Sequence, residues 1–477
     1  MADIDELVPL LPERNVVCFN PSRGPFRFFL LMFTCLLTFG SYFCFDMPSV
    51  LQTTFTAPLH PNSTGNCTTV DGEPAELVNV NGTNCTSGLG LSETQFNLLY
   101  AIYAWTNVIV VVLAGILVDK LGNPIGVMLF SSMCLAGTSV FAIGLYFKGT
   151  STMLPLFLLG RILFGSGTGG LTVVQNRVVA IWFKGKELAF AFGCLLAVSR
   201  LGSVLNFFLT ESFREKYGLR WTLWGGAFLC GADVFCAVMI SMLEVIGMKQ
   251  LKKKIEKTES KRMRLSDIKH LSSTYWLLTI CLMFFYTGVL PFMSDASKFI
   301  YVNYKATFDF TKKESSYIAG SVYFVSMILA PGLGLVVDKF GRRGILIFLC
   351  TTLTIPVYGI LAFAPSVHPL VATIWLGFTY SIAAASLWPS FPLVVEQATI
   401  GTAIGITCSF QMIGVGITNI IVGKMLDVIT SVHKWKYVVI FLLGNTLTSV
   451  VLAVLVNIND RRKGGILNRS SRKEDDA

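Results

Sequence analysis

The chain has 477 residues, of which 53% are hydrophobic and only 14% are charged, and its mean hydropathy is +0.64. A soluble core does not need so apolar a composition, which predicts a membrane protein instead. The formal net charge of +10 does not indicate nucleic-acid binding, because the basic residues gather in short segments between apolar runs.

Long apolar runs account for most of the chain. About 20 apolar residues cross a bilayer as an α-helix, and we count twelve runs long enough to do so. They predict an all-α membrane protein with twelve transmembrane helices and leave little room for a globular domain. The runs cover roughly residues 27–50, 95–118, 125–147, 153–182, 187–209, 221–244, 274–300, 315–337, 344–364, 369–395, 400–426 and 435–457.

Lys and Arg are distributed unevenly among the connecting segments. The segment 48–93 has none, the segment from Lys249 to Lys269 has nine, and the tail from Arg461 to Lys473 has six. Since basic loops stay on the cytosolic side, we expect both termini and the linker in the cytosol, with the linker near anionic membrane lipid. The expected parts are a cytosolic tail at 1–26, a six-helix half at 27–244, a cytosolic basic linker at 245–273, a second six-helix half at 274–457 and a cytosolic tail at 458–477.

The N-terminal tail carries an acidic residue followed by a leucine pair. The matching residues are Glu6, Leu10 and Leu11. In a cytosolic tail this pattern resembles the dileucine sorting signal by which clathrin adaptors route membrane proteins to endosomes and lysosomes. The alternative is an incidental leucine pair in a disordered tail.

The segment 48–93 is expected on the luminal side. It holds two cysteines, Cys67 and Cys85, for which we predict a disulfide because an oxidising compartment favours one. Dense N-x-S/T sequons predict a glycosylated loop. These sequons begin at Asn62, Asn66, Asn81 and Asn84.

A charged, glycine-bounded turn occurs twice, each time between two apolar runs, at 115–122 and at 334–343. Duplication of hydrophobic helices is the usual build of a secondary transporter, and each copy resembles the loop between helices 2 and 3 of each half in the major facilitator superfamily. Asp and Lys in these turns can pair across helix ends and hold one conformational state. The predicted gate residues are Gly115, Asp119, Lys120 and Gly122 in the first copy and Gly334, Asp338, Lys339, Gly341 and Arg342 in the second.

Two arginines and one acid lie in or at the ends of apolar runs. A charge at bilayer depth is costly, so it is expected to face protein or water. Arg161 begins a glycine-rich stretch suited to close helix contact. This stretch resembles the helix 4 arginine motif of the same superfamily, and we therefore include Arg161 among the predicted gate residues. Arg200 lies near the middle of its run, where a guanidinium can hold a carboxylate through two hydrogen bonds; a structural pair with an acid is the alternative. Asp46 is expected to be interfacial, with a vestibule position as the alternative.

Polar and aromatic side chains inside other runs are further candidates for substrate contact. Tyr103 and Asn107 extend along one helix face. Gln175, Trp388 and Gln411 lie in three other runs. Core packing or hydrogen bonds between helices are the alternative roles for all five.

Six short stretches carry a more specific resemblance, at 42–44, 182–188, 199–203, 387–389, 401–403 and 464–468. Together they resemble the lysosomal dipeptide uniporters of the major facilitator superfamily, over essentially the whole chain outside 48–93. The resemblance implies the major facilitator fold with two six-helix halves, and a lysosomal carrier that exports dipeptides to the cytosol by alternating access without proton coupling. It also implies a glycosylated lysosomal membrane protein as partner.

The resemblance also extends to single residues. Arg200 matches the arginine that would hold the peptide carboxylate in that family. The glutamate that the family places in helix 4, suited to the peptide amino group, is replaced here by Gly169. This departure leaves room for another amine partner, or for a substrate without an amine.

Other functions remain as alternatives. One is a proton-coupled or uniport carrier of another small carboxylated metabolite, with Asp46 or Glu396 as the titrating group in the coupled case; another is a nutrient sensor that has lost transport. An enzyme is not expected, because the sequence has no G-x-S-x-G, H-E-x-x-H or nucleotide-binding glycine loop in a suitable context. With four histidines in the chain, neither a metal site nor a cofactor is expected.

Overall fold

The computed structural model describes residues 24–59, 67–69, 76–79, 84–86, 88–183, 188–250, 271–395, 400–431 and 433–469. Helices dominate it. The first half contains α1 (Gly24–Leu36), α2 (Phe39–Thr56), α3 (Glu93–Leu121), α4 (Asn123–Gly144), the 3-10 turn η2 (Leu145–Phe147), α5 (Met153–Trp182) and α6 (Leu188–Gln250). The second half contains α7 (Ser273–Phe308), α8 (Lys312–Phe340), α9 (Arg343–Phe363), α10 (Pro369–Ser386), η4 (Trp388–Ser390), α11 (Phe391–Val394), α12 (Ile400–Val428), α13 (Lys434–Arg462) and η6 (Ile466–Asn468).

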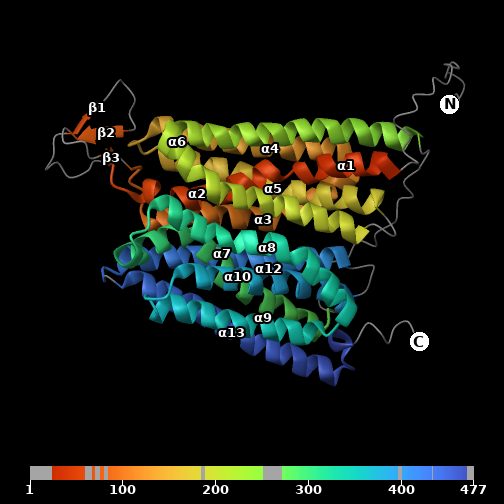
Figure 1. Ribbon diagram of the computed structural model, residues 1–477. Helices are drawn as coiled ribbons and strands as arrows, with labels where there is room; N and C mark the ends of the chain where they lie inside the picture. Colours follow the sequence, from red (N-terminus) through yellow and green to blue (C-terminus); the bar gives the residue numbers. More distant parts are fainter. Residues whose placement is uncertain are drawn as a thin grey trace, which may run out of the picture.

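The helices form two bundles that lie side by side (Figure 1). In the first, α4 packs on α5 and α6, and α2 packs on α6; in the second, α13 packs on α7 and α9, and α8 packs on α10. One hydrophobic core lies within the first bundle, and the core of the second bundle also includes Val50, Ala104, Val204 and Phe207 of the first. The bundles meet along three helix pairs, α3 with α12, α6 with α8 and α2 with α7. The two predicted halves therefore correspond to the two bundles, with an interface between them.

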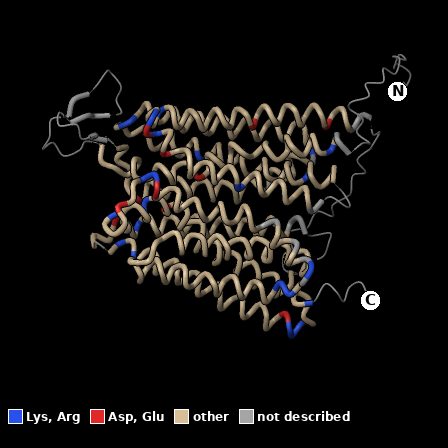
Figure 2. The backbone as a smooth tube through the Cα atoms, in the orientation of Figure 1, with Lys and Arg blue, Asp and Glu red and all other residues tan. Residues whose placement is uncertain are grey.

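The helices have the lengths that a bilayer requires. Within the described residues, nine segments are long and apolar enough to span a membrane. One of them, Phe190–Gly247, covers two antiparallel arms of α6, because the chain turns back at Gly218. Since α3 and α8 are also 29 residues each, the helices are consistent with the twelve predicted. Charged residues gather mainly at the two ends of the bundles, and few lie along the middle of the backbone (Figure 2).

The first predicted run differs from the structure in two respects. It is broken between α1 and α2, where the Gln175 side chain donates a 2.6 Å hydrogen bond to the Thr34 carbonyl. A side-chain donor here satisfies a carbonyl of the last turn of α1. The run also continues to Thr56, so the segment predicted to be luminal begins later than residue 48.

The segment between α2 and α3 contains three short strands that the sequence analysis does not predict. They are β1 (Cys67–Thr69), β2 (Glu76–Asn79) and β3 (Asn84–Thr86), antiparallel in the order β1-β2-β3. Strands of three or four residues are too short to produce a readable alternation. The register sets Cys67 opposite Asn79 and Cys85 opposite Leu77. Their side chains lie outside the described residues, as does the loop around Asn62, Asn66 and Asn81, so the disulfide and the glycosylation stay predictions.

The connecting segments lie at the two opposite ends of the helix bundles. The three strands lie at one end of the bundles, and the last residues of α6 and α13 lie at the opposite end (Figure 1). We refer to the end with the strands as the loop end. The dileucine residues and most of the basic linker lie outside the described residues, so the predicted domain boundaries and the placement of the termini stay predictions.

We predict that Gly218→Ala destabilises the protein. Gly218 has φ +78° and ψ 167°, a conformation that costs a residue with a Cβ about 1–3 kcal/mol. No atom lies within 4 Å of an added Cβ, so backbone strain is the only source of the effect. Thermal unfolding in detergent should show a lower transition temperature.

The matched control is Gly231→Ala in the second arm of α6. Its added Cβ also has open space, but its backbone is helical. It should leave stability unchanged or raise it by about 0.5–1 kcal/mol. Equal transition temperatures for the two variants would contradict the strained turn.

Candidate functional site

Arg200 lies where the two halves meet. It belongs to the first arm of α6, and its Nη2 donates a 2.7 Å hydrogen bond to the hydroxyl of Tyr380 on α10. The guanidinium carbon lies 4.6 Å from the centre of the Tyr380 ring and 5.6 Å from that of Tyr323 on α8. Because α8 and α10 belong to the second half, one charged side chain joins the two bundles.

Asp46 is buried inside α2, with 2% of its surface exposed. Its Oδ1 accepts a 3.3 Å hydrogen bond from the hydroxyl of Tyr323, whose ring also faces Arg200. The prediction of an interfacial Asp46 is wrong, because α2 continues to Thr56 and the carboxylate lies within the helix. An acid and a guanidinium therefore flank one phenol, an arrangement that supplies the partners buried charges need.

Trp388 belongs to the same group of side chains. Its Nε1 donates a 2.9 Å hydrogen bond to the hydroxyl of Tyr286 on α7, and the Tyr286 ring lies 6.0 Å from that of Tyr380. Trp388 is at the start of η4, where Pro389 removes a backbone donor and α10 gives way to a 3-10 turn. The tryptophan thus lies where the helix changes geometry.

These contacts define a polar and aromatic group that we call the Arg200 cluster. It consists of Asp46, Arg200, Tyr286, Tyr323, Tyr380 and Trp388. The sequence predicts Arg200 and Trp388 as substrate residues. It does not single out the three tyrosines, because an isolated aromatic residue in an apolar helix has the pattern of a core residue. Only their hydroxyl groups distinguish them from the many phenylalanines around them.

Tyr103 and Asn107 pack against α5. The hydroxyl of Thr168 donates a 3.0 Å hydrogen bond to that of Tyr103, and Asn107 Nδ2 donates to the Tyr103 carbonyl at 3.0 Å. A Cβ placed on Gly169 would lie 2.4 Å from Asn107 Oδ1. The asparagine therefore occupies the space beside Gly169, and both predicted residues have roles in helix packing.

Gln175 and Gln411 are also buried. Gln175 donates to the Thr34 carbonyl and, at 3.1 Å, to the hydroxyl of Thr38, so its amide secures the break between α1 and α2. Gln411 lies on α12, which packs on α3 and α7. In the part of the chain that the structure describes, no recorded contact joins either glutamine to the Arg200 cluster, and their substrate role stays a prediction.

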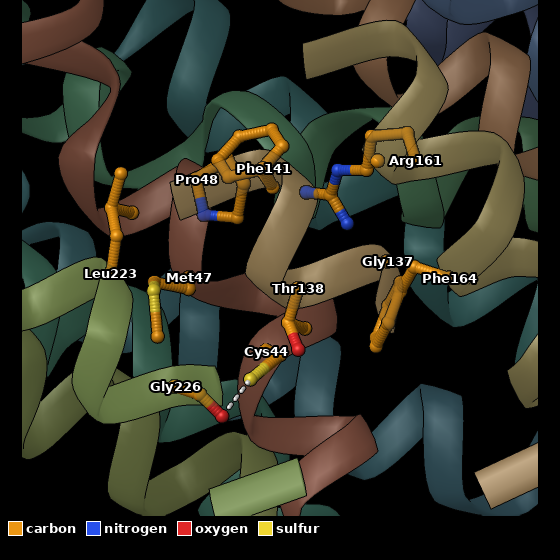
Figure 3. A pocket seen from close by; sticks show the side chains of 11 residues that line it. Cys44, Met47, Pro48, Gly137, Thr138, Phe141, Arg161, Phe164, Leu223 and Gly226 are labelled. Carbon is orange, nitrogen blue, oxygen red and sulfur yellow. Dashed lines mark hydrogen bonds between the residues drawn. The ribbon is translucent and has the colours of Figure 1, made fainter. Parts of the chain in front are cut away.

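Arg161 lies inside the first half, with 3% of its surface exposed. Its Nη2 donates to the Phe45 carbonyl at 3.3 Å, and its guanidinium carbon is 5.1 to 5.8 Å from the ring centres of Tyr100, Phe141 and Phe164. It lines a pocket between α2, α4, α5 and α6, where Figure 3 shows it beside Phe141. These contacts give Arg161 a role within one bundle, and its predicted part in gating stays a prediction.

Each of the two repeated turns contains a glycine with positive φ. Gly122 has φ +83° and Gly341 has φ +64°, and each amide closes the preceding helix by a hydrogen bond of 2.8 or 2.9 Å. The side chains of Asp119 and Asp338 lie outside the described residues, so the predicted gate pairs stay predictions. An added Cβ on Gly115 or Gly334 would meet nothing within 4 Å.

The two turns are secured by different partners. After the first, Asn123 Nδ2 donates to Glu244 Oε1 at 2.7 Å, which ties α4 to the second arm of α6. After the second, Asn468 Oδ1 accepts from the Ile345 amide at 3.0 Å, and Asn468 Nδ2 donates to Asp460 Oδ2 at 3.3 Å. The C-terminal segment therefore holds the start of α9, a role that the sequence analysis does not predict.

At the loop end the two halves are bound by polar contacts. Asp427 of α12 accepts hydrogen bonds from the first two amides of α3, those of Glu93 and Thr94, at 2.9 and 2.8 Å. A carboxylate at a helix N-terminus satisfies free amides and favours the helix dipole. Lys298 of α7 forms an ion pair with Glu93, and Ser49 donates to the Met293 carbonyl at 2.7 Å.

Contact between α3 and α12 continues inward from the loop end. A Cβ on Gly416 would lie 2.2 Å from Trp105 Nε1, and the Ser409 hydroxyl donates to the Val108 carbonyl at 3.4 Å. Farther from the loop end, added Cβ atoms on Gly115 and Gly405 meet nothing within 4 Å. The polar contacts between α3, α7 and α12 thus hold the two halves together at the loop end.

The sequence is similar to that of known transporters along almost its whole length. It is 31% identical over 485 residues to the lysosomal dipeptide transporter MFSD1 of Homo sapiens, an alignment that covers 99% of this chain and 95% of that protein. It is 30% identical over 468 residues to the protein of the same name from Danio rerio, covering 96% of this chain and 92% of the relative.

Solved structures share the fold. The crystal structure of the peptide transporter POT in complex with sulfate has a TM-score of 0.66 at 14% identity and covers 96% of this chain and 100% of its own. The crystal structure of the nucleoside transporter NupG has a TM-score of 0.63 at 12% identity, with 90% of this chain and 98% of its own covered. The family model of the Major Facilitator Superfamily matches residues 28–419. The chain belongs to the Major Facilitator Superfamily.

Proposed function

We propose that this protein is a facilitative carrier that exports dipeptides from the lysosomal lumen to the cytosol by alternating access. The relatives named lysosomal dipeptide transporter support the substrate and the compartment, since they align with nearly the full chain. The polar contacts that close the two halves together at the loop end support a carrier with two access states. In this proposal the described conformation is the one open to the cytosol.

The observation that carries the proposal is the partner of Arg200. Its guanidinium is bound to a neutral phenol of the opposite half, Tyr380, at 2.7 Å. A peptide carboxylate is a stronger partner, because charge-assisted and bidentate hydrogen bonds are shorter and stronger than bonds to a neutral hydroxyl. A carboxylate arriving at Arg200 would replace the phenol and so change the contact between the halves. Binding of the substrate and the change between access states are thereby linked.

Asp46 is the acid we propose for the peptide amino group. It is joined to Arg200 through Tyr323, and its Oδ2 has no hydrogen-bond partner among the described residues. Gly169 holds the position to which the family resemblance assigns a glutamate, and Asn107 fills the neighbouring space. The recognition of a zwitterion would therefore rest on the pair Arg200 and Asp46.

The cellular setting belongs to the same proposal. The loop end would face the lumen with glycans on 48–93, and both termini would face the cytosol. Glu6, Leu10 and Leu11 would bind clathrin adaptors, and a glycosylated lysosomal membrane protein would accompany the carrier.

Uptake of a labelled dipeptide into proteoliposomes, compared between the wild type and variants of Arg200, tests the proposal. Arg200→Ala should lower transport by about 10- to 100-fold, because a hydrogen-bonded charge partner contributes about 1.5–3 kcal/mol. Arg200→Lys should recover only part of the rate, since an ammonium lacks the planar fork.

The control for loss of a positive charge is Arg220→Ala. Arg220 lies over Tyr146 near the turn at Gly218, away from the Arg200 cluster. This variant should transport like the wild type. Transport by Arg200→Ala at the wild-type rate would remove Arg200 from the substrate site.

Because an added methyl group at Gly169 would meet Asn107, we expect the effects of substitutions at these two positions on stability to depend on each other. Gly169→Ala places a methyl group 2.4 Å from Asn107 Oδ1 and should destabilise the fold by about 1–3 kcal/mol. Asn107→Ala in the same chain should recover most of that loss, because it removes the obstructing amide. Thermal unfolding of the two single variants and the double variant measures the coupling.

Gly193→Ala is the matched control, because its added Cβ meets nothing within 4 Å. It should not lower the transition temperature. If the effects of Gly169→Ala and Asn107→Ala simply added, Asn107 would not be the group that fills this space.

A further inference from the structure

The loop end contains a buried group of charged and amide side chains that the proposed carrier mechanism does not use. We call it the loop-end lock. It joins the first half to the second and consists of Gln52 on α2, Glu93 and Asn97 on α3, and Asp295 and Lys298 on α7.

The contacts of the lock are specific. The Lys298 ammonium contacts the Glu93 carboxylate and the hydroxyl of Thr56. The Gln52 amide donates to Glu93 Oε2 at 3.3 Å and also to Asp295 Oδ1. Asn97 Nδ2 donates to the same Asp295 oxygen at 3.4 Å. One amide therefore links two carboxylates that lie on opposite halves.

The lock has more negative than positive charge. Glu93 and Asp295 are two carboxylates, and Lys298 is one ammonium, which contacts Glu93. The side chains of Lys298 and Glu93 are 14% and 10% exposed, and Asp295 is 3% exposed. One negative charge is thus left uncompensated in a site with little access to water, where like charges repel strongly.

The lock also has too few hydrogen-bond donors. Asp295 Oδ2, Gln52 Oε1 and Asn97 Oδ1 are buried and have no partner among the described residues. All three are acceptors. One additional hydrogen on a carboxylate would neutralise the excess charge and supply a donor at the same time.

Other groups near Asp295 do not compensate its charge. Asp427 of α12 is bound to the first amides of α3. Tyr100 of α3 is a phenol and carries no charge at neutral pH. No further charged contact to Asp295 is recorded from α2, α8 or α13 within the described ranges.

We propose that the loop-end lock is a proton-binding site, in which Asp295 takes up one proton when the two halves close at the loop end. Opening the lock exposes Asp295 to water and separates it from Glu93, so the open state releases that proton. Glu93 keeps its charge and its ion pair with Lys298 in the closed state.

The sign of the pH effect follows from this exchange. The closed state binds one proton more than the open state, so closure becomes more favourable as pH falls. An acidic compartment on the loop side would hold the lock closed in the absence of substrate. This effect requires the two-half fold only and does not depend on the identity of the substrate.

The test measures the distance between the halves at the loop end. Spin labels at Thr150 and Val428, in a background whose reactive cysteines are replaced by serine, report the open and closed populations by double electron–electron resonance without any substrate. Both residues are exposed, one in each half. Between about pH 7.5 and about pH 5, the closed-to-open ratio of the unsubstituted lock should rise by about threefold or more.

Asp295→Asn and Glu93→Gln each remove the excess negative charge, so each should reduce this pH response to less than about 1.5-fold. Asp427→Asn is the control: it should lower the closed population at both pH values and keep the response, because it weakens the α3 cap but leaves the lock's charges intact. The proposal is overturned if acid opens the unsubstituted lock, or if both Asp295→Asn and Glu93→Gln retain the full response. A carrier that fails to transport dipeptides would leave this result unchanged.

Discussion

The architecture depends on one constraint: a guanidinium at bilayer depth needs partners, and Arg200 finds them in the other half of the protein. Its hydrogen bond to Tyr380 and its contacts with two aromatic rings cross the boundary between the two bundles. A group that satisfies Arg200 more fully than a phenol necessarily changes that boundary. Recognition and conformational change are therefore properties of the same contact.

The boundary is not uniform along its length. Near the loop end, Asp427 of α12 accepts hydrogen bonds from two backbone amides of α3, and glycines of α12 allow close approach. The ion pair of Glu93 with Lys298 joins α3 to α7 at the same end. Beyond the contact of Ser409 with Val108, the added Cβ atoms of Gly115 and Gly405 have open space. Arg200 also crosses this boundary, through its hydrogen bond to Tyr380.

Much of the fold can be predicted from hydropathy, because a bilayer fixes the length and composition of a spanning helix. The run at 153–182 coincides with α5, and α3 and α8 each end at one of the two repeated turns. The break after α1, the strands of 67–86 and the depth of Asp46 could not be predicted, because they depend on a tertiary donor, on short-range pairing and on where a helix ends. The site can be predicted in part: charge identifies Arg200, but Tyr286, Tyr323 and Tyr380 become recognisable only once the fold brings their hydroxyl groups together.

The most direct measurement compares the binding of a dipeptide with that of the same dipeptide carrying a C-terminal amide, by calorimetry on the wild type and on Arg200→Ala. If Arg200 holds the carboxylate, the wild type should prefer the free acid by about tenfold or more, and the variant should bind both weakly and without preference. A variant that still prefers the free acid, or a wild type that binds both equally, would contradict the assignment of Arg200 as the carboxylate partner.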